Sequence, residues 1–453
     1  MKRHIIYIAL ILTATLGSCN NFLEVDPPKD QLMAGEAFSD ETTATAAVVG
    51  MYEEMNSYNY QFANVLMNLL GGMTSDDIYA IFTSFDDFRY NTLGPSTSYL
   101  SQFWDQPYAY IYHANSVIEG LEASDALVPE VKNQLLGEAH FLRGFCYFYL
   151  YNLFGPVPLV TNTEVKKNSA LPVSTSQEIQ AFLIQELSMA EDLMQDAYPS
   201  EGRVRPNKKA ASALLARIYL YQQDWQKAEE YASKVIGDTR YKLIDLQGVF
   251  LSNSEEAIWQ LQTVNTSTAG VNTWEGFNTV PFAAGQPSYY IITDDLYNSF
   301  EAGDLRLSQW INTFSTANSS GGTTVYHYPF KYTHRTSSPV EEYSMVMRVA
   351  EQYLIRAEAR AQSGNLEDAL KDVNAIRGRA DLELLPDQTQ SQLLDAIAAE
   401  RRHELFTEWG HRWFDLIRTG KAVEVLAPQK EGFTQEDLLF PIPLSATLTN
   451  PNL

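Results

Sequence analysis

Residues 215–230 read LARIYLYQQDWQKAEE, and residues 356–371 read RAEARAQSGNLEDALK. In the first stretch Ala216 and Ala228 stand twelve residues apart on either side of a short turn, and two alanines of the second stretch repeat that spacing. Small residues so placed let two antiparallel helices approach closely, as in the tetratricopeptide pattern of small and large positions. The two copies predict that helix hairpins are the structural unit of this fold.

Apolar residues recur at helical spacing along most of the chain. They predict helices at 44–55, 103–121, 131–154, 177–194, 207–221, 225–236, 345–363, 366–379 and 390–418, and Gly410 is a candidate break in the last of these. We therefore expect an all-α protein, with tetratricopeptide-like helix hairpins on one side and long irregular ligand-binding loops elsewhere.

Two stretches lack sustained helical periodicity. Residues 261–338 are rich in Thr, Asn, Ser and Gly and also carry many aromatic residues, and residues 71–99 combine aromatic residues with Asp and Arg. Long irregular segments inside a helical protein are often functional, because binding residues concentrate on loops that a rigid scaffold positions. We expect these two stretches to face the ligand.

The N-terminus has the pattern of a secretory signal. A short basic segment precedes an apolar run at 5–16, which as a helix would rise about 18 Å and is too short to span a bilayer of about 30 Å. The run ends at Leu16-Gly17-Ser18-Cys19, which resembles a bacterial lipobox. We predict a signal peptide at 1–18 and a lipid on Cys19 as the only membrane attachment. An ordinary signal peptide followed by a chance cysteine is the alternative.

Composition and charge limit the classes of partner. The 453 residues are 45% hydrophobic and 19% charged, which is typical of a folded globular protein. The 32 Lys and Arg residues against 56 Asp and Glu residues give a net charge of −24. A field of this sign repels phosphate, so we expect no nucleic-acid partner. Tyrosine, with 26 residues, exceeds phenylalanine and suits surfaces that contact amphipathic ligands.

Motifs for catalysis are absent from the sequence. His403-Glu404 begins like a zinc-protease helix, but the position four residues after His403 is Thr407, so two histidines cannot chelate on one helix face. No dinucleotide-binding glycine motif, P-loop or Gly-x-Ser-x-Gly occurs. Cys146 lies in an apolar stretch and is expected to be a buried thiol. We predict no catalytic residues, no metal and no cofactor.

Several blocks of sequence resemble one family. They are Glu138-Ala139-His140-Phe141-Leu142-Arg143, Phe154-Gly155-Pro156-Val157-Pro158-Leu159, the run from Arg348 to Ala359, the run from Glu400 to Arg418, and Phe440-Pro441-Ile442-Pro443. In this order they are similar to the SusD/RagB nutrient-binding outer-membrane lipoproteins, with Gly144 where the family usually has Ala. The resemblance extends from Cys19 to Leu453 and implies a single nutrient-binding domain over 19–453.

The resemblance also implies a function. It predicts a surface lipoprotein that captures oligosaccharide and presents it to a SusC-like TonB-dependent outer-membrane transporter. Three alternatives remain open: a peptide-binding member of the same family, a glycoside hydrolase, and a helical scaffold for another protein. The missing catalytic motifs argue against the hydrolase, and the aromatic-rich loops argue against a pure scaffold.

The predicted ligand contacts come from both irregular stretches. Those in the first stretch lie where the family's early ligand loop often falls, and those in the second follow from composition. They are Asp77, Tyr79, Arg89, Tyr90, Trp274, Phe277, Tyr289 and Tyr290. The charged residues Glu138, Arg143, Glu400 and Arg412 of the family blocks are instead expected to form internal ion pairs or caps.

Overall fold

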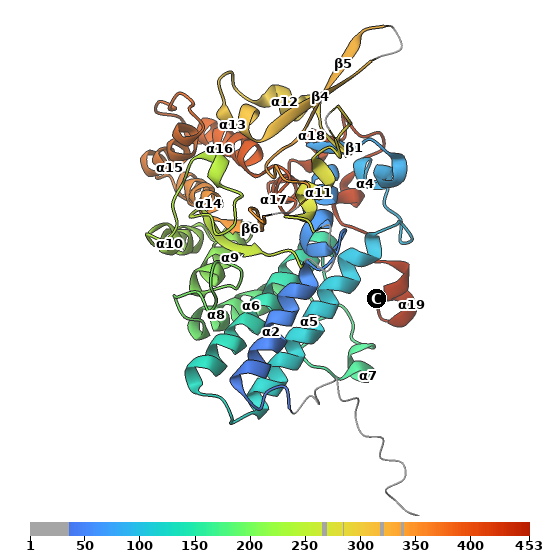
Figure 1. Ribbon diagram of the computed structural model, residues 1–453, viewed down its shortest axis with the longest axis vertical. Helices are drawn as coiled ribbons and strands as arrows, with labels where there is room; N and C mark the ends of the chain where they lie inside the picture. Colours follow the sequence, from blue (N-terminus) through green and yellow to red (C-terminus); the bar gives the residue numbers. More distant parts are fainter. Residues whose placement is uncertain (1–35, 265–269, 284, 318–320, 337–338) are drawn as a thin grey trace, which may run out of the picture.

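The computed structural model describes residues 36–264, 270–283, 285–317, 321–336 and 339–453. The predicted signal peptide and Cys19 lie outside the described residues. Long helices form the lower part of the molecule, a second group of helices forms its upper left, and short helices and strands fill the upper right (Figure 1). Within the described ranges, no helix combines the length and the apolar character needed to cross a membrane.

The longer helices follow the predicted segments closely. They are α2 (Glu41–Met55), α5 (Leu100–Ala123), α6 (Pro129–Phe154), α8 (Ser176–Leu193), α9 (Lys208–Tyr221), α10 (Trp225–Ile236), α14 (Val349–Gln362), α15 (Leu366–Arg379), α16 (Gln390–Leu405) and α17 (His411–Arg418). Gly410, in the left-handed conformation with φ 68°, precedes α17. The expected break near this glycine is confirmed.

The two hairpins predicted from the repeated spacing are α9–α10 and α14–α15. Ala216, Ala228, Ala357 and Ala369 are all fully buried. Each second helix starts at a polar cap: the Asp224 side chain accepts from the backbone of α10, and an asparagine does the same for α15. Small buried residues and a capped turn thus produce the tetratricopeptide-like pairs, and α10 packs against α14 to join them.

Helix α6 forms the centre of the hydrophobic core. Cys146 in this helix is fully buried, as predicted, and burial raises the pKa of its thiol. The Phe145 ring lies 5.3 Å from Trp259 and 5.2 Å from Trp409, centroid to centroid. Aromatic packing therefore connects α6 to strand β2 and to the turn between α16 and α17.

Short elements make up the rest of the described chain. The helices are η2 (Phe62–Leu70), α3 (Gly71–Met73), η3 (Thr83–Phe85), α4 (Asp86–Arg89), α7 (Val165–Asn168), η4 (Leu246–Gly248), α11 (Trp274–Thr279), α12 (Asp294–Ser299), α13 (Leu305–Gln309), α18 (Ala422–Leu426), η5 (Gln435–Leu438) and α19 (Leu444–Thr449). The strands are β1 (Ile78–Ala80), β2 (Ala257–Leu261), β3 (Tyr290–Ile292), β4 (Ile311–Ala317), β5 (Thr323–Pro329) and β6 (Ser344–Arg348), which pair as β1–β3, β2–β6 and β4–β5.

Two expectations about these regions were wrong in detail. Residues 344–348 form strand β6 on β2 and do not begin the predicted helix at 345, because the chain stays extended through Arg348 before α14 starts. The stretch 261–338 is not irregular throughout, since it contains the three short helices α11, α12 and α13, the hairpin of β4 and β5, and strand β3, which pairs with β1. The β1–β3 pairing joins segments far apart in the sequence, which local periodicity does not reveal.

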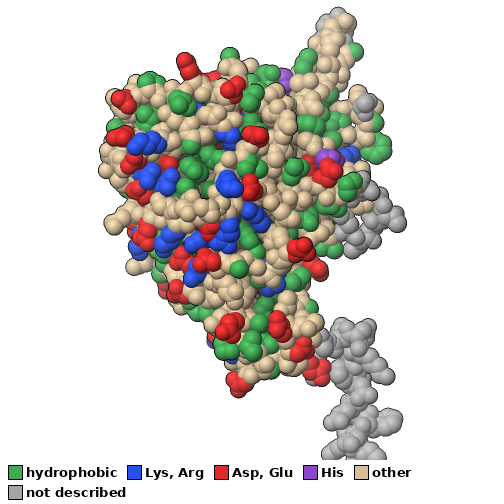
Figure 2. All heavy atoms as spheres, turned by 60° about the vertical axis from the view of Figure 1, so that its left-hand side comes forward, with side chains coloured by type: hydrophobic (Ala, Val, Ile, Leu, Met, Phe, Trp, Pro, Cys, Tyr) green, Lys and Arg blue, Asp and Glu red, His purple; other side chains and the backbone are tan. Residues whose placement is uncertain are grey.

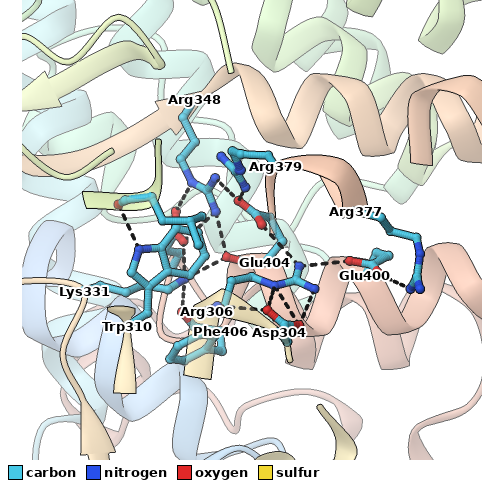
Figure 3. A network of polar contacts seen from close by, with 12 residues as sticks. Asp304, Arg306, Trp310, Lys331, Arg348, Arg377, Arg379, Glu400, Glu404 and Phe406 are labelled. Carbon is cyan, nitrogen blue, oxygen red and sulfur yellow. Dashed lines mark hydrogen bonds and ion pairs between the residues drawn. The ribbon is translucent and has the colours of Figure 1, made fainter. Parts of the chain in front are cut away.

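A buried network of charges fastens the C-terminal helices to this region (Figure 3). Arg348 donates to Glu256 at 2.7 Å and to both oxygens of Glu408 at 2.8 and 2.9 Å. Lys331 donates to the Glu408 carboxylate at 2.5 Å and to the Phe406 carbonyl oxygen at 2.8 Å. Buried charges require such partners, because an unpaired one costs several kcal/mol. The network therefore fixes the scaffold on which the loops sit.

The charged residues of the family blocks form internal ion pairs, as expected. Glu138 pairs with Arg205, Arg143 with Glu186, Glu400 with Arg377 and Arg306, and Arg412 with Asp76. These blocks build the scaffold.

Candidate ligand-binding site

A two-stranded sheet joins the two stretches selected from the sequence. Strands β1 and β3 pair in antiparallel fashion, with Ala80 opposite Tyr290. The Ile81 N–H continues the ladder by donating to the Tyr289 carbonyl oxygen at 3.0 Å. Segments far apart in the sequence thus become neighbours at the upper right of the molecule (Figure 1).

The pleat of this sheet decides which side chains reach solvent. Successive residues of a strand point to opposite faces. Tyr79, Ile81 and Tyr289 therefore share the outer face, and Ala80 and Tyr290 share the inner one. Tyr289 is 42% exposed, whereas Tyr290 is fully buried. Two adjacent tyrosines predicted as ligand contacts thus have different surroundings.

A cluster of aromatic rings supports the sheet. The Phe82 ring lies 5.9 Å from Tyr289 and 6.2 Å from Tyr290, and the Tyr290 hydroxyl is 3.1 Å from that of Tyr60. Tyr60 and Tyr99, whose rings are 5.3 Å apart, both have left-handed backbones, with φ of 60° and 67°. Such conformations are uncommon outside glycine and cluster at functional sites.

Arg89 stacks between two predicted contacts. Its guanidinium carbon lies 4.3 Å from the Tyr79 ring centre and 5.2 Å from that of Tyr90, which is exposed. No hydrogen bond within the described residues involves the Arg89 side chain. A stacked guanidinium keeps its N–H donors in its own plane, so they can reach the hydroxyl or carbonyl oxygens of a ligand.

The structure places Asp77 against the scaffold. Asp77 is buried, and Arg402 of α16 donates to its carboxylate at 2.9 Å. Burial raises the pKa of Asp77 despite this arginine. The neighbouring Asp76 accepts from Arg412 at 2.8 and 2.9 Å; burial acts to raise its pKa, but the two arginines outweigh it and the pKa is lowered. Both carboxylates hold the start of β1 on α16 and α17.

The remaining two predicted residues lie on α11. The Trp274 indole N–H donates to the Asn56 carbonyl oxygen at 3.3 Å, and its ring is 5.8 Å from that of Phe277. The Arg335 guanidinium covers the other side, 4.2 Å from the Phe277 ring centre and 5.7 Å from that of the exposed Phe282. Trp274 is therefore anchored, whereas Phe277 belongs to a surface stack.

These two groups are joined next to Tyr289. The Ser288 hydroxyl donates to the carbonyl oxygen of Thr279, the last residue of α11, at 2.6 Å. Tyr289 also contacts Phe82, as described above. We call the combined set the aromatic surface, and it consists of Tyr79, Ile81, Phe82, Arg89, Tyr90, Phe277, Phe282, Tyr289 and Arg335.

Sequence reasoning missed four members of the aromatic surface as contacts. Ile81, Phe82, Phe282 and Arg335 all lie in the stretches that composition had selected. The strand alternation around Tyr79 could have indicated Ile81. The other three become neighbours of the predicted residues only through long-range pairing and cation–π stacking, so no local pattern marks them.

A hairpin extends beyond the aromatic surface. Strands β4 and β5 project from the top of the molecule, and β5 packs beside β3 (Figure 1). Phe314 and Tyr326 face each other across the pair, with their rings stacked at 5.2 Å. Residues 311–329 include no Lys, Arg, Asp or Glu. Figure 2 shows the contrast with the helical face, where basic and acidic side chains are intermixed.

The aromatic surface combines apolar ring faces with polar groups. Flat rings present apolar faces, and two stacked guanidinium groups and several phenols add polar edges. Among the described residues no group of three or more His, Cys, Asp or Glu side chains could hold a metal ion.

Comparison with known proteins gives the family. A family model described as starch-binding and associating with the outer membrane matches residues 21–220, and one described as the SusD family matches residues 301–453. A SusD-like protein of Formosa agariphila is 29% identical, with the alignment covering 100% of this chain and 99% of the relative.

Solved structures agree in fold. A SusD superfamily protein of Parabacteroides distasonis superposes with a TM-score of 0.78 at 24% identity, covering 93% of this chain and 99% of the other. A laminarin-binding SusD-like protein superposes with a TM-score of 0.77 at 26% identity, covering 91% and 98%. The chain belongs to the SusD/RagB family.

Proposed function

We propose that this protein captures neutral oligosaccharides on the aromatic surface and delivers them to a SusC-like TonB-dependent transporter. The observation that carries the proposal is the outer face of β1 and β3, where Tyr79, Tyr289 and the stacked Arg89 lie side by side. The C–H face of a sugar ring stacks on tyrosine, and its hydroxyls accept from guanidinium. The family's starch-binding description and a laminarin-binding relative support this ligand class.

The charge distribution favours a neutral ligand. The whole chain carries −24, and the hairpin beside the site carries no Lys, Arg, Asp or Glu over residues 311–329. A strongly anionic polymer would meet a repulsive field on approach, whereas a neutral glycan would not. Hydroxyl-rich strands next to the aromatic surface fit the same ligand class.

The proposal also includes a lipid anchor for the protein and the absence of catalytic cleavage of the ligand. Residues 1–18 act as a signal peptide, Cys19 carries the lipid, and residues 19–453 form one binding domain at the outer membrane. The protein holds its ligand without cleaving it. Incubation with laminarin or starch should leave the size distribution of the glycan unchanged, and cleavage abolished by a single carboxylate substitution would instead indicate a hydrolase.

The direct test is calorimetric titration with laminarin oligosaccharides, malto-oligosaccharides and a peptide library. We expect saturable binding of at least one glycan series. Tyr289→Ala should weaken it, and Tyr112→Ala is the matched control, because Tyr112 lies on α5 with nearly the same exposure, 43% against 42%. Binding of peptides alone would assign the protein to the peptide-binding members of the family. Co-purification with a TonB-dependent barrel tests delivery.

A further inference from the structure

A buried lysine lies beneath the first ligand segment, which we define as residues 75–90. Lys430 follows α18 and is only 5% exposed. Its ammonium group donates to the carbonyl oxygens of Met73 and Thr74, at 3.2 and 2.7 Å, and to the Asn91 side-chain oxygen at 2.5 Å. An ammonium group has three N–H donors, so every donor is used.

The three acceptors mark both ends of the first ligand segment. Met73 and Thr74 precede it, and Asn91 follows it directly after Arg89 and Tyr90. One ammonium group therefore closes a loop that carries four of the eight predicted ligand contacts. Closing a loop of this length costs conformational entropy, which these hydrogen bonds offset in the folded protein.

The surroundings of Lys430 show that burying its ammonium group costs free energy. Burial lowers the pKa of Lys430 to about 7, Arg89 acts in the same direction, and Asp76 and Asp77 act in the opposite direction. Asn91 has a left-handed backbone, with φ of 55°, two residues after α4 ends at Arg89. An apolar residue at position 430 would avoid the desolvation of an ammonium group. The buried cation is therefore explained by its hydrogen bonds to both ends of the first ligand segment.

Lys430 is itself held firmly by the C-terminal scaffold. Its N–H donates to the Leu426 carbonyl oxygen at 2.9 Å, and its own carbonyl oxygen accepts from Phe433 at 3.2 Å. The Phe433 ring packs 6.3 Å from that of Trp413 in α17. The lysine thus connects the chain after α18 to both ends of the first ligand segment.

We propose that Lys430 is a positioning residue, which closes the first ligand segment at both ends and so holds Tyr79, Arg89 and Tyr90 in the arrangement that binds glycan. The affinity part of this inference depends on the proposed function, whereas the closure of the segment does not. Lys430 is not expected to reach a ligand itself, because it is only 5% exposed.

Hydrogen exchange on the free protein tests the closure without any ligand. In Lys430→Met we expect amides of residues 75–90 to exchange about ten-fold faster or more, with α6 and the β2–β6 sheet unchanged. Lys421→Met is the control, since Lys421 is exposed and pairs with Asp395 at 3.4 Å outside this segment. Unchanged exchange at 75–90, or faster exchange spread evenly over the chain, would overturn the inference.

A milder variant keeps the test valid if Lys430→Met does not fold. Asn91→Ala removes one acceptor and also places an alanine in a left-handed backbone (φ 55°), so exchange should rise near residues 88–93 and stay low at residues 73–75. Asn91→Asp supplies an acceptor of the same shape and should retain the wild-type protection. If Asn91→Ala leaves exchange at residues 88–93 unchanged, that result would contradict closure of the segment by Lys430.

Titration with laminarin and malto-oligosaccharides then tests positioning. We expect Lys430→Met to weaken the affinity of the bound series about five-fold or more while Lys421→Met leaves it unchanged. Unchanged affinity in a variant with a loosened segment would overturn the positioning role and leave the proposed function intact. If the wild-type protein binds no glycan, the proposed function fails, and the exchange experiment still decides whether Lys430 closes the segment.

Discussion

Replacing two adjacent tyrosines should have opposite consequences. Tyr289 lies on the outer face of β3 and is 42% exposed, whereas Tyr290 on the inner face is fully buried. Tyr290→Ala removes a ring packed on Phe82 and Phe85 and the hydroxyl contact with Tyr60. Truncation of a buried aromatic residue costs about 3–5 kcal/mol. Unfolding entropy of about 2.1 cal/mol/K per residue converts this loss into a decrease in Tm of about 3–5 °C for a chain of this length.

Tyr289→Ala removes a partly exposed ring and should change Tm by less than about 1 °C, since substitutions outside the core are usually small in effect. A stacked aromatic ring contributes about 0.5–1.5 kcal/mol beyond its buried area, so glycan affinity should fall about two- to twelve-fold. Tyr290→Phe is the control for the ring without the hydroxyl, and it should retain most of the stability.

Differential scanning calorimetry and titration of the two alanine variants provide the measurements. The reasoning assumes that strand register decides which tyrosine faces the ligand. A loss of affinity in Tyr290→Ala with an unchanged Tm, together with wild-type behaviour of Tyr289→Ala, would refute that register. Equal loss of Tm in both variants would show that neither ring belongs to a ligand surface.

Three further outcomes are expected. Arg348→Met removes one cation from the buried carboxylates Glu256, Glu404 and Glu408, which keep Arg379 or Lys331 as a partner, and should lower the free energy of unfolding by about 3 kcal/mol. Lys371→Met in an exposed pair should leave Tm unchanged, and calorimetry distinguishes the two variants. Burial lowers the pKa of His403 to about 3 and of His411 to about 4, so below pH 6.5 the unfolded chain binds protons that the native chain does not. The free energy of unfolding should therefore fall by about 2 kcal/mol per histidine between pH 6.5 and 5, as measured by urea titration. The variant with both histidines replaced by Gln should show a flatter pH profile. Cys19→Ala should release the protein from the membrane fraction, and retention without a lipid label would contradict lipidation.

The helices could be predicted from sequence because their causes are local. Amphipathic spacing, capping residues and paired alanines act within one or two turns, and the hairpins at α9–α10 and α14–α15 begin and end close to the expected residues. Strand β6 was missed because its residues are all buried, and a short buried run gives the same apolar pattern as a helix.

The candidate site could be predicted only at the level of segments. Composition selected the two stretches, but the β1–β3 pairing decides that Tyr289 is exposed and Tyr290 buried. A shift of one residue in register would exchange their environments. Register is a property of contacts between distant segments, so the sequence around either tyrosine does not specify it.

The chain as a whole is acidic, and the cations next to the candidate ligand site form contacts inside the protein. Arg402 and Arg412 neutralise Asp76 and Asp77, and Lys430 holds the ends of the same segment, so these charges are used internally. Arg89 is different, because it stacks on tyrosine rings and makes no hydrogen bond within the described residues. Charged side chains thus fix the first ligand segment, while the aromatic rings and the stacked Arg89 belong to the aromatic surface. The second stacked guanidinium, that of Arg335, also donates to the Phe277 and Val280 carbonyl oxygens. This division suits a ligand that is recognised by ring faces and hydroxyl groups, and a polyanion would need more unpaired cations at the surface than this site presents.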